Sequence, residues 1–586
     1  MEVKRLFDIL EFNKQSYNVD DALAAKENGK WIKYSTEDVY NNCTFLAYGL
    51  MSIGVQKNDN IALIANNRPE WVFADYAMQM SGGISVPIYP TISDNDLKFI
   101  FNDAQIKFAF VSSKELYDKV SAIKSEVPSL KEIITFNKVD GAKNWKDILE
   151  LGKKEQNTAK MNEMKASIKE SDLATILYTS GTTGNPKGVM LSHKNLVSQV
   201  KSVKKCMPIV PGDKALSFLP LNHVYERMLE YNYQSLGISI YFAESLETIA
   251  DNLKEVKPHV FTTVPRLLEK VYDKIVAKGE DLTGIKRTLF FWALNLGLKY
   301  ELDGKNGAWY EFQLKIARKL IFSKWQEALG GNIKTIVSGG AALQERLARV
   351  FWGAGIPVLE GYGLTETSPV IAVNYLDKGC TKFGTVGTVI DGCEVKIAED
   401  GEILVKGPNI MMGYYKRPEA TAEVIVNGWF HTGDIGIFVE GKYLKITDRK
   451  KEIFKTSGGK YIAPQMIENK LKESPYIEQA MVVGENEKFA SALIVPSFIN
   501  LKDYFSKKGK SFSSNEELIK DSEVNELIKS HINQMNQTLA QYESIKKFEL
   551  LPREWSIDNG EMTPKLSLKR KIITAANKSL IEGMYK

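Results

Sequence analysis

The chain has 586 residues, more than one compact hydrophobic core usually organises, so we expect at least two domains. Apolar residues make up 44% of the chain and charged residues 25%, a balance typical of an ordinary soluble globular protein. The formal net charge of +5 arises from 77 basic and 72 acidic residues, an excess too small and dispersed to indicate a nucleic-acid partner. A weak attraction to anionic membrane surfaces stays open.

Cysteine usage and the first residues bear on the compartment. None of the four cysteines forms a Cys-x-x-Cys pair or has a nearby histidine at metal-ligand spacing, which indicates reduced thiols. The start, MEVKRLFD, scatters charges among apolar residues and does not resemble a signal peptide, and no uncharged apolar run reaches the roughly 18 residues of a membrane span. We therefore expect a cytoplasmic protein, with peripheral membrane contact and a homodimer left open.

Residues 1 to about 170 alternate helical patterns with short apolar strands. Strands are predicted at 60–65, 84–89 and 107–111, and the helical stretches between them indicate βαβ units with largely parallel sheets. Residues 148–171 are rich in Lys, Glu and Asn and are interpreted as a solvated connector.

The next segment carries the strongest local pattern. An apolar run at 173–177 predicts a buried strand, residues 178–188 read YTSGTTGNPKG, and Ser192 is placed to cap a helix that carries Leu196 and Val200. Three glycines allow close backbone approach, five hydroxyls from Tyr178 to Thr183 add donors, and Lys187 adds a cation. Such a loop suits a polyphosphate, although it lacks the Walker spacing, and Ser/Thr/Gly content alone is more often a flexible turn.

The whole string resembles the phosphate loop of the adenylate-forming superfamily, which contains acyl-CoA synthetases, firefly luciferase and the adenylation domains of peptide synthetases. The resemblance implies that loop residues bind ATP; they are Thr179, Ser180, Gly181, Thr182, Thr183, Gly184 and Lys187.

Two following segments extend the resemblance. Residues 218–227 (FLPLNHVYER) lie between phosphate loop and acyl pocket in the family, so His223 resembles a residue that senses nucleotide and acid, although a lone histidine at a strand end is usually structural. Residues 261–272 (FTTVPRLLEKVY) are similar to the long-chain acyl-CoA synthetases in particular. The helical run at 287–298 is apolar almost all round; we expect core, with an acyl-tunnel wall or a lipid-facing surface as alternatives.

A second cluster of motifs comprises 338–343 (SGGAAL) and 360–369 (EGYGLTETSP). Glycines beside an aromatic allow a flat ring to lie on Tyr362, and a carboxylate shortly after it can reach a magnesium ion on the phosphates. By resemblance, Gly340, Ala341, Tyr362 and Gly363 line the nucleotide, Thr365 touches the α-phosphate, and Glu366 holds Mg²⁺.

The third cluster covers 427–436 (NGWFHTGDIG) and 443–453 (YLKITDRKKEI). A carboxylate can accept both hydroxyls of a ribose, and an arginine can reach a second ribose or phosphate oxygen. The resemblance gives these roles to Asp434 and Arg449 and places Ile446 beside the nucleotide; the alternative for Asp434 is an Asx cap.

The family also implies a hinge and a thiol-binding loop. Asp448 matches the hinge between a large N-terminal domain (residues 1–447, ATP and acid) and a small mobile C-terminal one (448–586). In 455–464 (KTSGGKYIAP), Lys455, Ser457, Gly458 and Gly459 resemble the loop on the CoA side. The lysines around it suit the phosphates of CoA or, as the alternative, a solvated face.

The catalytic lysine loop departs from the family pattern. Residues 560–571 read GEMTPKLSLKRK, and the long-chain pattern puts Ser567 where a lysine should stand. In an extended loop Lys565, Ser567 and Lys569 share one face, so either lysine could serve. We favour Lys569 over Lys565 as the catalytic residue, alongside Glu366 and His223.

The resemblance covers most of the chain, with family strings from about residue 175 to 465. It implies an α/β fold with layered, mostly parallel sheets, a β-barrel-like part and a small α+β C-terminal domain. The implied activity is long-chain fatty acid–CoA ligation with ATP, Mg²⁺ and CoA. Alternatives are transfer to an acyl carrier protein, a medium-chain or aromatic acid as substrate, and, from another class, a weakly catalytic acyl-nucleotide binding protein suggested by Ser567.

Overall fold

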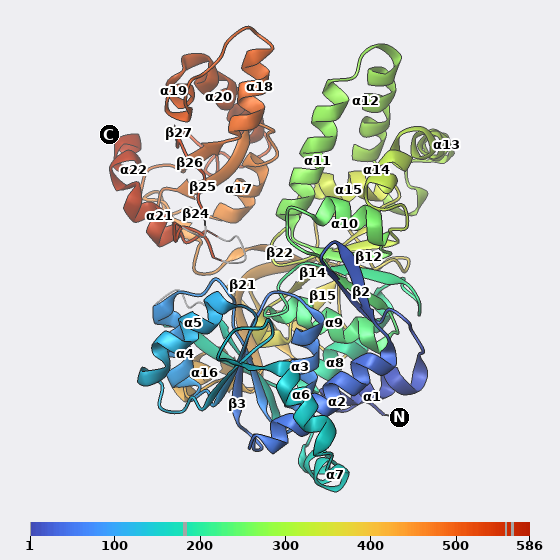
Figure 1. Cartoon of the computed structure of the whole chain (residues 1–586). Helices are drawn as coiled ribbons and strands as arrows, with labels where there is room; N and C mark the ends of the chain where they lie inside the picture. Colours follow the sequence, from blue (N-terminus) through green and yellow to red (C-terminus); the bar gives the residue numbers. More distant parts are fainter. Residues whose placement is uncertain (1, 180–184, 557–558, 564–567) are drawn as a thin grey trace.

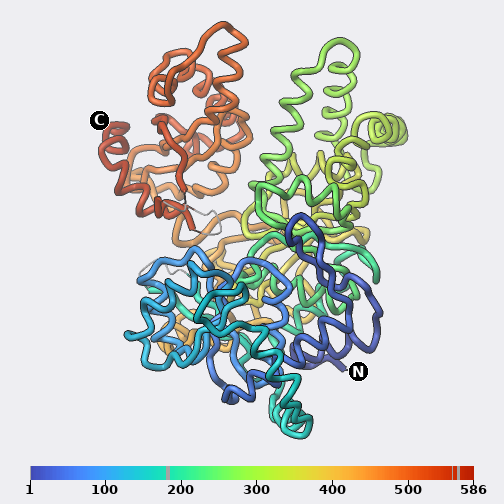
Figure 2. Tube along the Cα trace, viewed as in Figure 1, coloured from blue at the N-terminus to red at the C-terminus, as the bar shows by residue number. Residues whose placement is uncertain are grey.

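The computed structural model of the chain describes residues 2–179, 185–556, 559–563 and 568–586. Figure 1 shows a large body formed by the chain up to strand β22 and a smaller body of C-terminal residues above it, beside the projecting helices α11 and α12. The continuous trace in Figure 2 follows the same division, with the orange and red C-terminal residues gathered on one side.

The first sheet of the large body has eight strands in the order β19-β9-β8-β4-β3-β5-β6-β7. Its neighbours from β8 to β7 pair in parallel, whereas β9 and β19 join in antiparallel fashion. The parallel pairs confirm the βαβ expectation for the N-terminal part. In the order of the sheet, the strands are Gly413–Tyr414, Lys187–Ser192, Leu173–Thr179, Ile84–Pro87, Asn60–Ile64, Phe108–Val111, Glu132–Thr135 and Lys143–Asn144.

The second sheet has nine strands in the order β16-β15-β14-β13-β12-β10-β11-β1-β2. Parallel pairing runs from β14 to β1, and antiparallel strands close both edges. In that order the strands are Thr388–Val389, Val370–Val373, Val358–Gly363, Thr335–Ser338, Val260–Thr263, Lys214–Ser217, Ser239–Phe242, Leu23–Glu27 and Lys30–Tyr34.

A third, antiparallel sheet provides the part that we expected to resemble a barrel. Its order is β17-β18-β21-β20, with β22 paired to β21, and its strands are Glu394–Ile397, Glu402–Lys406, Trp429–Val439, Ile425–Val426 and Tyr443–Arg449. Leu444 exchanges backbone hydrogen bonds with Val386 and Gly387, which joins this sheet to the edge of the nine-stranded one. The start of β22 therefore lies next to β16, the edge strand of the nine-stranded sheet.

The small body is α+β. Strands β25, β26 and β27 (Ile477–Val483, Ser491–Pro496 and Lys547–Leu550) form one sheet, and β23 and β24 (Phe454–Lys455 and Tyr461–Ile462) form a hairpin. Its helices α17 to α22 are Pro464–Leu471, Phe498–Ser506, Asn515–Lys520, Ser522–Asn536, Arg570–Ala576 and Lys578–Tyr585.

Several helices of the large body begin at a residue whose side chain caps them, as in α2, α4, α5 and α8. The Ser192 hydroxyl accepts a hydrogen bond from the backbone N–H of Asn195 at 3.1 Å, so α8 starts where we predicted. Helices α1 to α8 are Leu6–Ser16, Thr36–Ser52, Pro69–Met80, Asp94–Asp103, Lys114–Ile123, Trp145–Lys154, Thr158–Ser167 and His193–Val203. Helices α9 to α16 are Val224–Ser235, Ile249–Val256, Pro265–Glu280, Gly284–Leu298, Ala308–Ala317, Ser323–Ala328, Glu345–Gly353 and Pro418–Val424.

The stretch 148–171, which we interpreted as a solvated connector, is mostly helical. It contributes to two helices, α6 and α7, whose exposed residues give the polar composition while Ile148, Leu149 and Met161 are buried in the core. Composition misled the interpretation because one apolar residue per turn suffices to anchor an otherwise solvated helix.

The described hydrophobic clusters divide along the chain. Four of them contain residues up to Ile446, two contain residues from Phe454 onward, and none of the clusters combines the two ranges. The boundary that we placed at residue 448 falls within β22 and stays a prediction. Among the described helices, none has the length and apolar character needed to cross a bilayer.

Candidate active site

Three of the expected nucleotide residues meet at the junction of two sheets. The Tyr362 hydroxyl, at the end of β14, donates a hydrogen bond to Oδ2 of Asp434 in β21 at 2.7 Å. Asp434 and Arg449 face each other in the register of β21 and β22, with the Arg449 Nε 3.6 Å from the Asp434 Oδ1. Burial raises the pKa of Asp434, while Arg449 and the Tyr362 hydrogen bond oppose that rise. Each carboxylate oxygen can accept more than one hydrogen bond, so Asp434 keeps capacity for ribose hydroxyls.

A second group forms around Glu366. This residue lies in the short 3₁₀ turn Thr365–Thr367 that follows β14, and its Oε1 accepts a hydrogen bond from the Tyr414 hydroxyl at 2.9 Å. The ammonium of Lys187 lies 5.2 Å from the centroid of the Tyr414 ring, within cation–π range. Tyr414 therefore contacts a carboxylate through its hydroxyl and a cation through its ring.

The segment between these groups is tightly packed. A Cβ on Gly363 would lie 1.7 Å from the Pro369 carbonyl oxygen, so no other residue fits there. The Glu360 carboxylate accepts a hydrogen bond from the Leu343 N–H at 3.1 Å, and burial raises the pKa of Glu360 to about 8. Because Tyr362 and Glu366 are four residues apart on this segment, the two groups are fixed relative to each other.

The phosphate loop is only partly within the described residues. Thr179 ends β8 and Lys187 begins β9, as the predicted strand–loop–strand order requires. Ser180, Gly181, Thr182, Thr183 and Gly184 lie outside the described residues. The Tyr178 hydroxyl, which we counted among the loop donors, instead donates to Oδ2 of Asp103 at 2.7 Å.

His223 is the N-cap of α9. Its Nδ1 accepts a hydrogen bond from the Tyr225 N–H at 3.2 Å, which fixes the ring at the start of the helix. One turn further along α9, the buried Glu226 accepts hydrogen bonds from Ser217 and Thr262, and burial raises the pKa of its carboxyl to about 7. The helix start is thereby attached to β10 and β12.

Gly340 and Ala341 follow β13 on an exposed turn. Gly340 has a φ of +82°, a conformation that side chains disfavour, and its ideal Cβ would lie 4.0 Å from Val264. The nine-stranded sheet places β13 next to β14, so this turn and the Tyr362 segment leave the same edge of the sheet.

The expected hinge residue bonds to both bodies. Asp448 accepts hydrogen bonds from the Arg449 N–H at 2.6 Å and from the Gln465 N–H of α17 at 3.1 Å. Burial raises the pKa of Asp448 to about 7, aided by the nearby Glu452 and Glu468.

Residues of the expected CoA side form the β23–β24 hairpin and its tip. The Ser457 N–H donates to the Glu487 carbonyl at 2.9 Å, Gly458 and Gly459 lie in the turn, and the ammonium of Lys455 lies 5.5 Å from the Tyr461 ring centroid. Lys450, one of the lysines near this loop for which we expected contact with the phosphates of CoA, is less available because it pairs with Asp400 and Glu402 at 2.6 and 2.8 Å.

Lys569 is the N-cap of α21, and its backbone N–H donates to the Glu561 carbonyl at 2.8 Å. The neighbouring Arg570 forms a salt bridge with the buried Glu468 at 2.6 Å, which attaches the start of α21 to α17. Lys565 and Ser567 lie outside the described residues, so the choice between the two lysines stays a prediction.

Several polar contacts link the two bodies. Arg266, in the first turn of α11, forms salt bridges with Glu269 of the same helix and with Glu478 of β25. Gln344 donates to the Lys472 carbonyl at 3.4 Å, and the exposed Lys507 lies 3.6 Å from Asp281. In the long-chain-like segment 261–272, Arg266 therefore contacts the small body.

The apolar run at 287–298 forms most of α12 and packs into the core through one side. Its buried residues are Phe290, Ala293, Leu294, Leu296 and Gly297, which confirms the core interpretation for that face.

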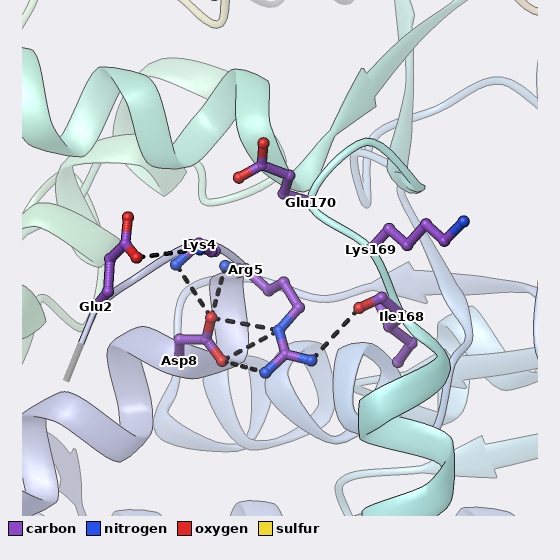
Figure 3. Close-up of a pocket in the computed structure, with 7 residues that line it drawn as sticks. All are labelled: Glu2, Lys4, Arg5, Asp8, Ile168, Lys169 and Glu170. Atoms are coloured by element: carbon purple, nitrogen blue, oxygen red, sulfur yellow. Dashed lines mark hydrogen bonds and ion pairs between the residues drawn. The ribbon is translucent and has the colours of Figure 1, made fainter.

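A hollow near the N-terminus does not belong to this site. Figure 3 shows two ion pairs among its charged residues, Arg5 with Asp8 at 2.8 Å and Lys4 with Glu2 at 3.0 Å. The hollow therefore has internal ion pairs at a place where α1 meets the chain before β8.

Tyr414 is the site residue that sequence reasoning missed. It lies in β19, which pairs with β9 so that Tyr414 stands opposite Val189, two residues after Lys187. More than 40 residues separate it from Glu366 along the chain, and the only local signal was an aromatic residue following Gly413, whose φ is +135°. Strand pairing, which the sequence does not specify, brings it to the site.

The arrangement fits a magnesium ion held mainly by a ligand. No group of three His, Cys, Asp or Glu side chains suited to a metal occurs among the residues described. Mg²⁺ commonly takes one or two carboxylates and completes its shell with phosphates and water, so the single carboxylate of Glu366 suffices.

The chain matches known protein families in two consecutive parts. Residues 12–415 match the family of AMP-binding enzymes, and residues 451–586 match the AMP-binding enzyme C-terminal domain. The chain is 34% identical to the long-chain-fatty-acid–CoA ligase FadD15 of Mycobacterium bovis, over 95% of this chain and 93% of that protein. It is 32% identical to long-chain-fatty-acid–CoA ligase 1 of Cavia porcellus, over 100% of this chain and 87% of that protein.

Solved structures share the fold. The anthranilate CoA ligase AuaEII, solved with anthranoyl-AMP, aligns with a TM-score of 0.75 at 17% identity, over 99% of this chain and 98% of that one. The O-succinylbenzoate CoA synthetase of Bacillus subtilis, solved with ATP and a magnesium ion, aligns with a TM-score of 0.68 at 21% identity, over 96% of this chain and 98% of that one. With both sequence matches and both fold matches spanning nearly the whole chain, this protein belongs to the family of AMP-binding enzymes.

Proposed function

We propose that the protein is an ATP-dependent, AMP-forming ligase that joins a long-chain fatty acid to CoA. The observation that carries the proposal is that the short segment 362–366 joins two groups of side chains. The first group is Tyr362, Asp434 and Arg449, and the second is Glu366, Tyr414 and Lys187. The first group suits a nucleoside, and the second offers a carboxylate and a cation for phosphates. Relatives named long-chain-fatty-acid–CoA ligases cover nearly the whole chain, which supports a fatty acid as the substrate.

The first half-reaction activates the acid. An oxygen of the fatty carboxylate attacks the α-phosphorus of ATP, the bond to the β-phosphate oxygen breaks, and acyl-AMP and pyrophosphate result. The step concentrates negative charge on phosphorus and on the leaving group, so it is favoured by fixed cations and donors rather than by a covalent enzyme intermediate. A magnesium ion, when bound, neutralises phosphate charge.

Each of these side chains has a place in this step. Asp434 accepts the ribose hydroxyls, Arg449 neutralises its buried carboxylate and reaches a ribose or phosphate oxygen, and the Tyr362 ring supports the adenine. Glu366 ligates the magnesium ion, oriented by the Tyr414 hydroxyl, and Lys187 faces the phosphates. His223, fixed at the start of α9, senses acid and nucleotide.

The second half-reaction transfers the acyl group. The thiol sulfur of CoA attacks the carbonyl carbon of acyl-AMP, the bond to the phosphate oxygen breaks, and AMP departs with the acyl-CoA formed. We assign the thiol side to the β23–β24 hairpin with Lys455, Ser457, Gly458 and Gly459, and the first half-reaction to Lys569. Rotation of the small body about Asp448 would present the two faces in turn, a hinge-type change supported by the separate cores on either side.

Two further assignments complete the proposal. The protein works in the cytoplasm with peripheral contact to a membrane, where long-chain acids accumulate, and a homodimer is compatible with it. Transfer to a carrier protein in place of CoA remains the second candidate, since the same acyl-AMP would serve both thiols.

The experiment measures ATP–pyrophosphate exchange without any thiol, using acetate, octanoate, palmitate, oleate and benzoate in separate reactions. The proposal expects the strongest exchange with palmitate or oleate. Acids that support exchange are then supplied with CoA or with an acyl carrier protein, and AMP release is expected with CoA.

Exchange strongest with acetate or benzoate would reject the long-chain assignment and keep the adenylation. AMP release with the carrier protein alone would favour the second candidate. Absence of exchange with all five acids would reject the enzymatic proposal and favour an acyl-nucleotide binding protein.

A further inference from the structure

Helix α13 and the helical turns after it carry an exposed apolar stripe. The large apolar residues of this stripe are Trp309, Phe312, Ile316 and Leu320, with 71%, 55%, 37% and 49% of their surfaces exposed. They stand three, seven and eleven positions along a helical path that runs through Ala308–Ala317 and the π-helical turn Arg318–Phe322, so they follow one face. The rings of Trp309 and Phe312 stack, with centroids 5.6 Å apart.

The opposite side of this helix is anchored to the large body. Leu314 and Ala317 are fully buried, the Tyr310 hydroxyl donates to the Leu296 carbonyl of α12, and the Arg318 guanidinium donates to the Gly353 carbonyl at 2.8 Å. Figure 1 shows α13 at the margin of the molecule, away from the small body. The stripe is therefore a supported outer surface and not a face of the core.

The exposed charges along the stripe itself have one sign, while two exposed carboxylates, Asp303 and Glu327, lie just beyond its ends. The exposed charged residues between positions 304 and 326 are all lysines: Lys305, Lys315, Lys319 and Lys324. The one carboxylate in that range, Glu311, is half-buried. Aromatic and aliphatic side chains on one helix face, flanked by lysines, are the composition of helices that lie in the interface of an anionic bilayer.

We propose that this stripe, from Lys305 to Lys324, docks on an anionic phospholipid bilayer. Trp309, Phe312, Ile316 and Leu320 enter the boundary between headgroups and acyl chains, and the four lysines contact the headgroups. The inference rests on the proposed function, which includes contact with a membrane. The stripe gives the location of that contact and places the enzyme where a long-chain fatty acid dissolves.

Charge complementarity favours a lipid surface over a second copy of the chain. A symmetric contact between two such stripes would bring four lysines against four, at a cost that like charges impose. The bilayer offers anionic headgroups to all of them at once.

The test is co-sedimentation of the full chain with vesicles of phosphatidylcholine alone or mixed with phosphatidylglycerol. We expect binding to the mixed vesicles that falls with added salt, and much weaker binding to phosphatidylcholine. Replacing Trp309 and Phe312 together with Ser should weaken binding at least about tenfold. Replacing Lys315 and Lys319 together with Ala should weaken it about thirtyfold at low salt, since each lysine near such a surface contributes about a factor of five.

Matched controls lie elsewhere on the chain. Ile499→Ser removes an apolar residue with 83% exposure on the small body, and Lys154→Ala with Lys160→Ala removes two exposed lysines from α6 and α7; all should bind like the unaltered protein. Pyrophosphate exchange with octanoate, measured without vesicles, should be the same in every variant. This arm separates the two proposals, since exchange tests adenylation and sedimentation tests docking.

Equal binding by the stripe variants and the unaltered protein would overturn the inference, as would failure of the unaltered protein to bind the mixed vesicles. Light scattering provides a further outcome against the proposal. If Trp309→Ser with Phe312→Ser converted a dimer to a monomer, and neither form bound vesicles, the stripe would join copies of the chain and the lipid proposal would be rejected.

Discussion

The nucleotide end and the thiol end of the molecule are built differently. At the nucleotide end, Tyr362, Glu366 and Asp434 belong to strands and turns of the large body; Tyr362 bonds to Asp434, and Glu366 bonds to Tyr414. At the thiol end, the β23–β24 hairpin belongs to the small body, which has its own hydrophobic clusters and also carries Lys569. It meets the large body through polar contacts such as Arg266 with Glu478.

The difference is instructive for the two half-reactions. Charge stabilisation at phosphorus benefits from groups that do not reorganise, and the nucleotide end has them in one packed assembly. The change from the first half-reaction to the second benefits from a small body that can be repositioned. Ion pairs with little apolar contact hold that body only weakly in one position. The following substitutions test whether the two ends behave as separately as they are built.

Glu366→Gln should produce the largest effect. The amide keeps the shape and can still accept from Tyr414, but it lacks the charge that binds Mg²⁺, so pyrophosphate exchange should fall about a hundredfold to a thousandfold. Thiolysis of acyl-AMP supplied from outside should change far less. Near-normal exchange at saturating Mg²⁺ would show that Glu366 is not a metal ligand.

Lys569→Ala and Lys565→Ala, made singly, should separate the two lysines. Removal of the catalytic one should slow exchange about a hundredfold through loss of a cation at the developing charge, while thiolysis of supplied acyl-AMP survives. We expect that result for Lys569. Small and equal losses from both variants would mean that neither occupies the assigned position.

Tyr414→Phe removes one hydroxyl and keeps the ring beside Lys187. Loss of a hydrogen bond to a carboxylate costs about 1.5–3 kcal/mol, so we expect exchange to fall by a factor between roughly ten and a hundred, with a higher requirement for Mg²⁺. Tyr178→Phe is the matched control, because its hydroxyl bonds to Asp103. If both variants lost exchange equally, the Tyr414 contact would carry no special role in positioning Glu366.

Arg266→Ala should produce the smallest effect and the most informative pattern. It removes a partly exposed ion pair to the small body, worth about 1 kcal/mol or less, so the rates should change no more than about fivefold. We expect the ratio of exchange to thiolysis to change, because the described placement of the small body suits one half-reaction better than the other. Equal reductions in both rates would remove Arg266 from the control of that placement.

The sequence predicted elements better than it predicted pairings. The strand before the phosphate loop, the Ser192 cap and α8 were correct because local periodicity and capping chemistry determine them. The helices within 148–171 were missed because their composition is that of a solvated surface. Site residues with distant partners show the same contrast. Tyr362, Asp434 and Arg449 were predicted because they lie in sequence motifs of the family. Tyr414 was not predicted, because only the pairing of β19 with β9 brings it to the site.

Other features lay beyond both composition and resemblance. The engagement of Lys450 by Asp400 and Glu402, and of the Tyr178 hydroxyl by Asp103, depends on which loops the fold brings together. The exposed stripe on α13 could not be predicted either. Its apolar spacing is that of an ordinary helix face packed in the core, and only the structure shows that this face is exposed.

The central claim is that one chain forms acyl-AMP and then passes the acyl group to CoA. The most direct measurement is a single turnover with excess protein, palmitate and radiolabelled ATP, quenched before and after CoA is added. The account predicts protein-bound palmitoyl-AMP with one pyrophosphate released per ATP, followed on CoA addition by palmitoyl-CoA and AMP in equal amounts. Release of ADP, or formation of palmitoyl-CoA with no acyl-AMP at any time before it, would contradict the account.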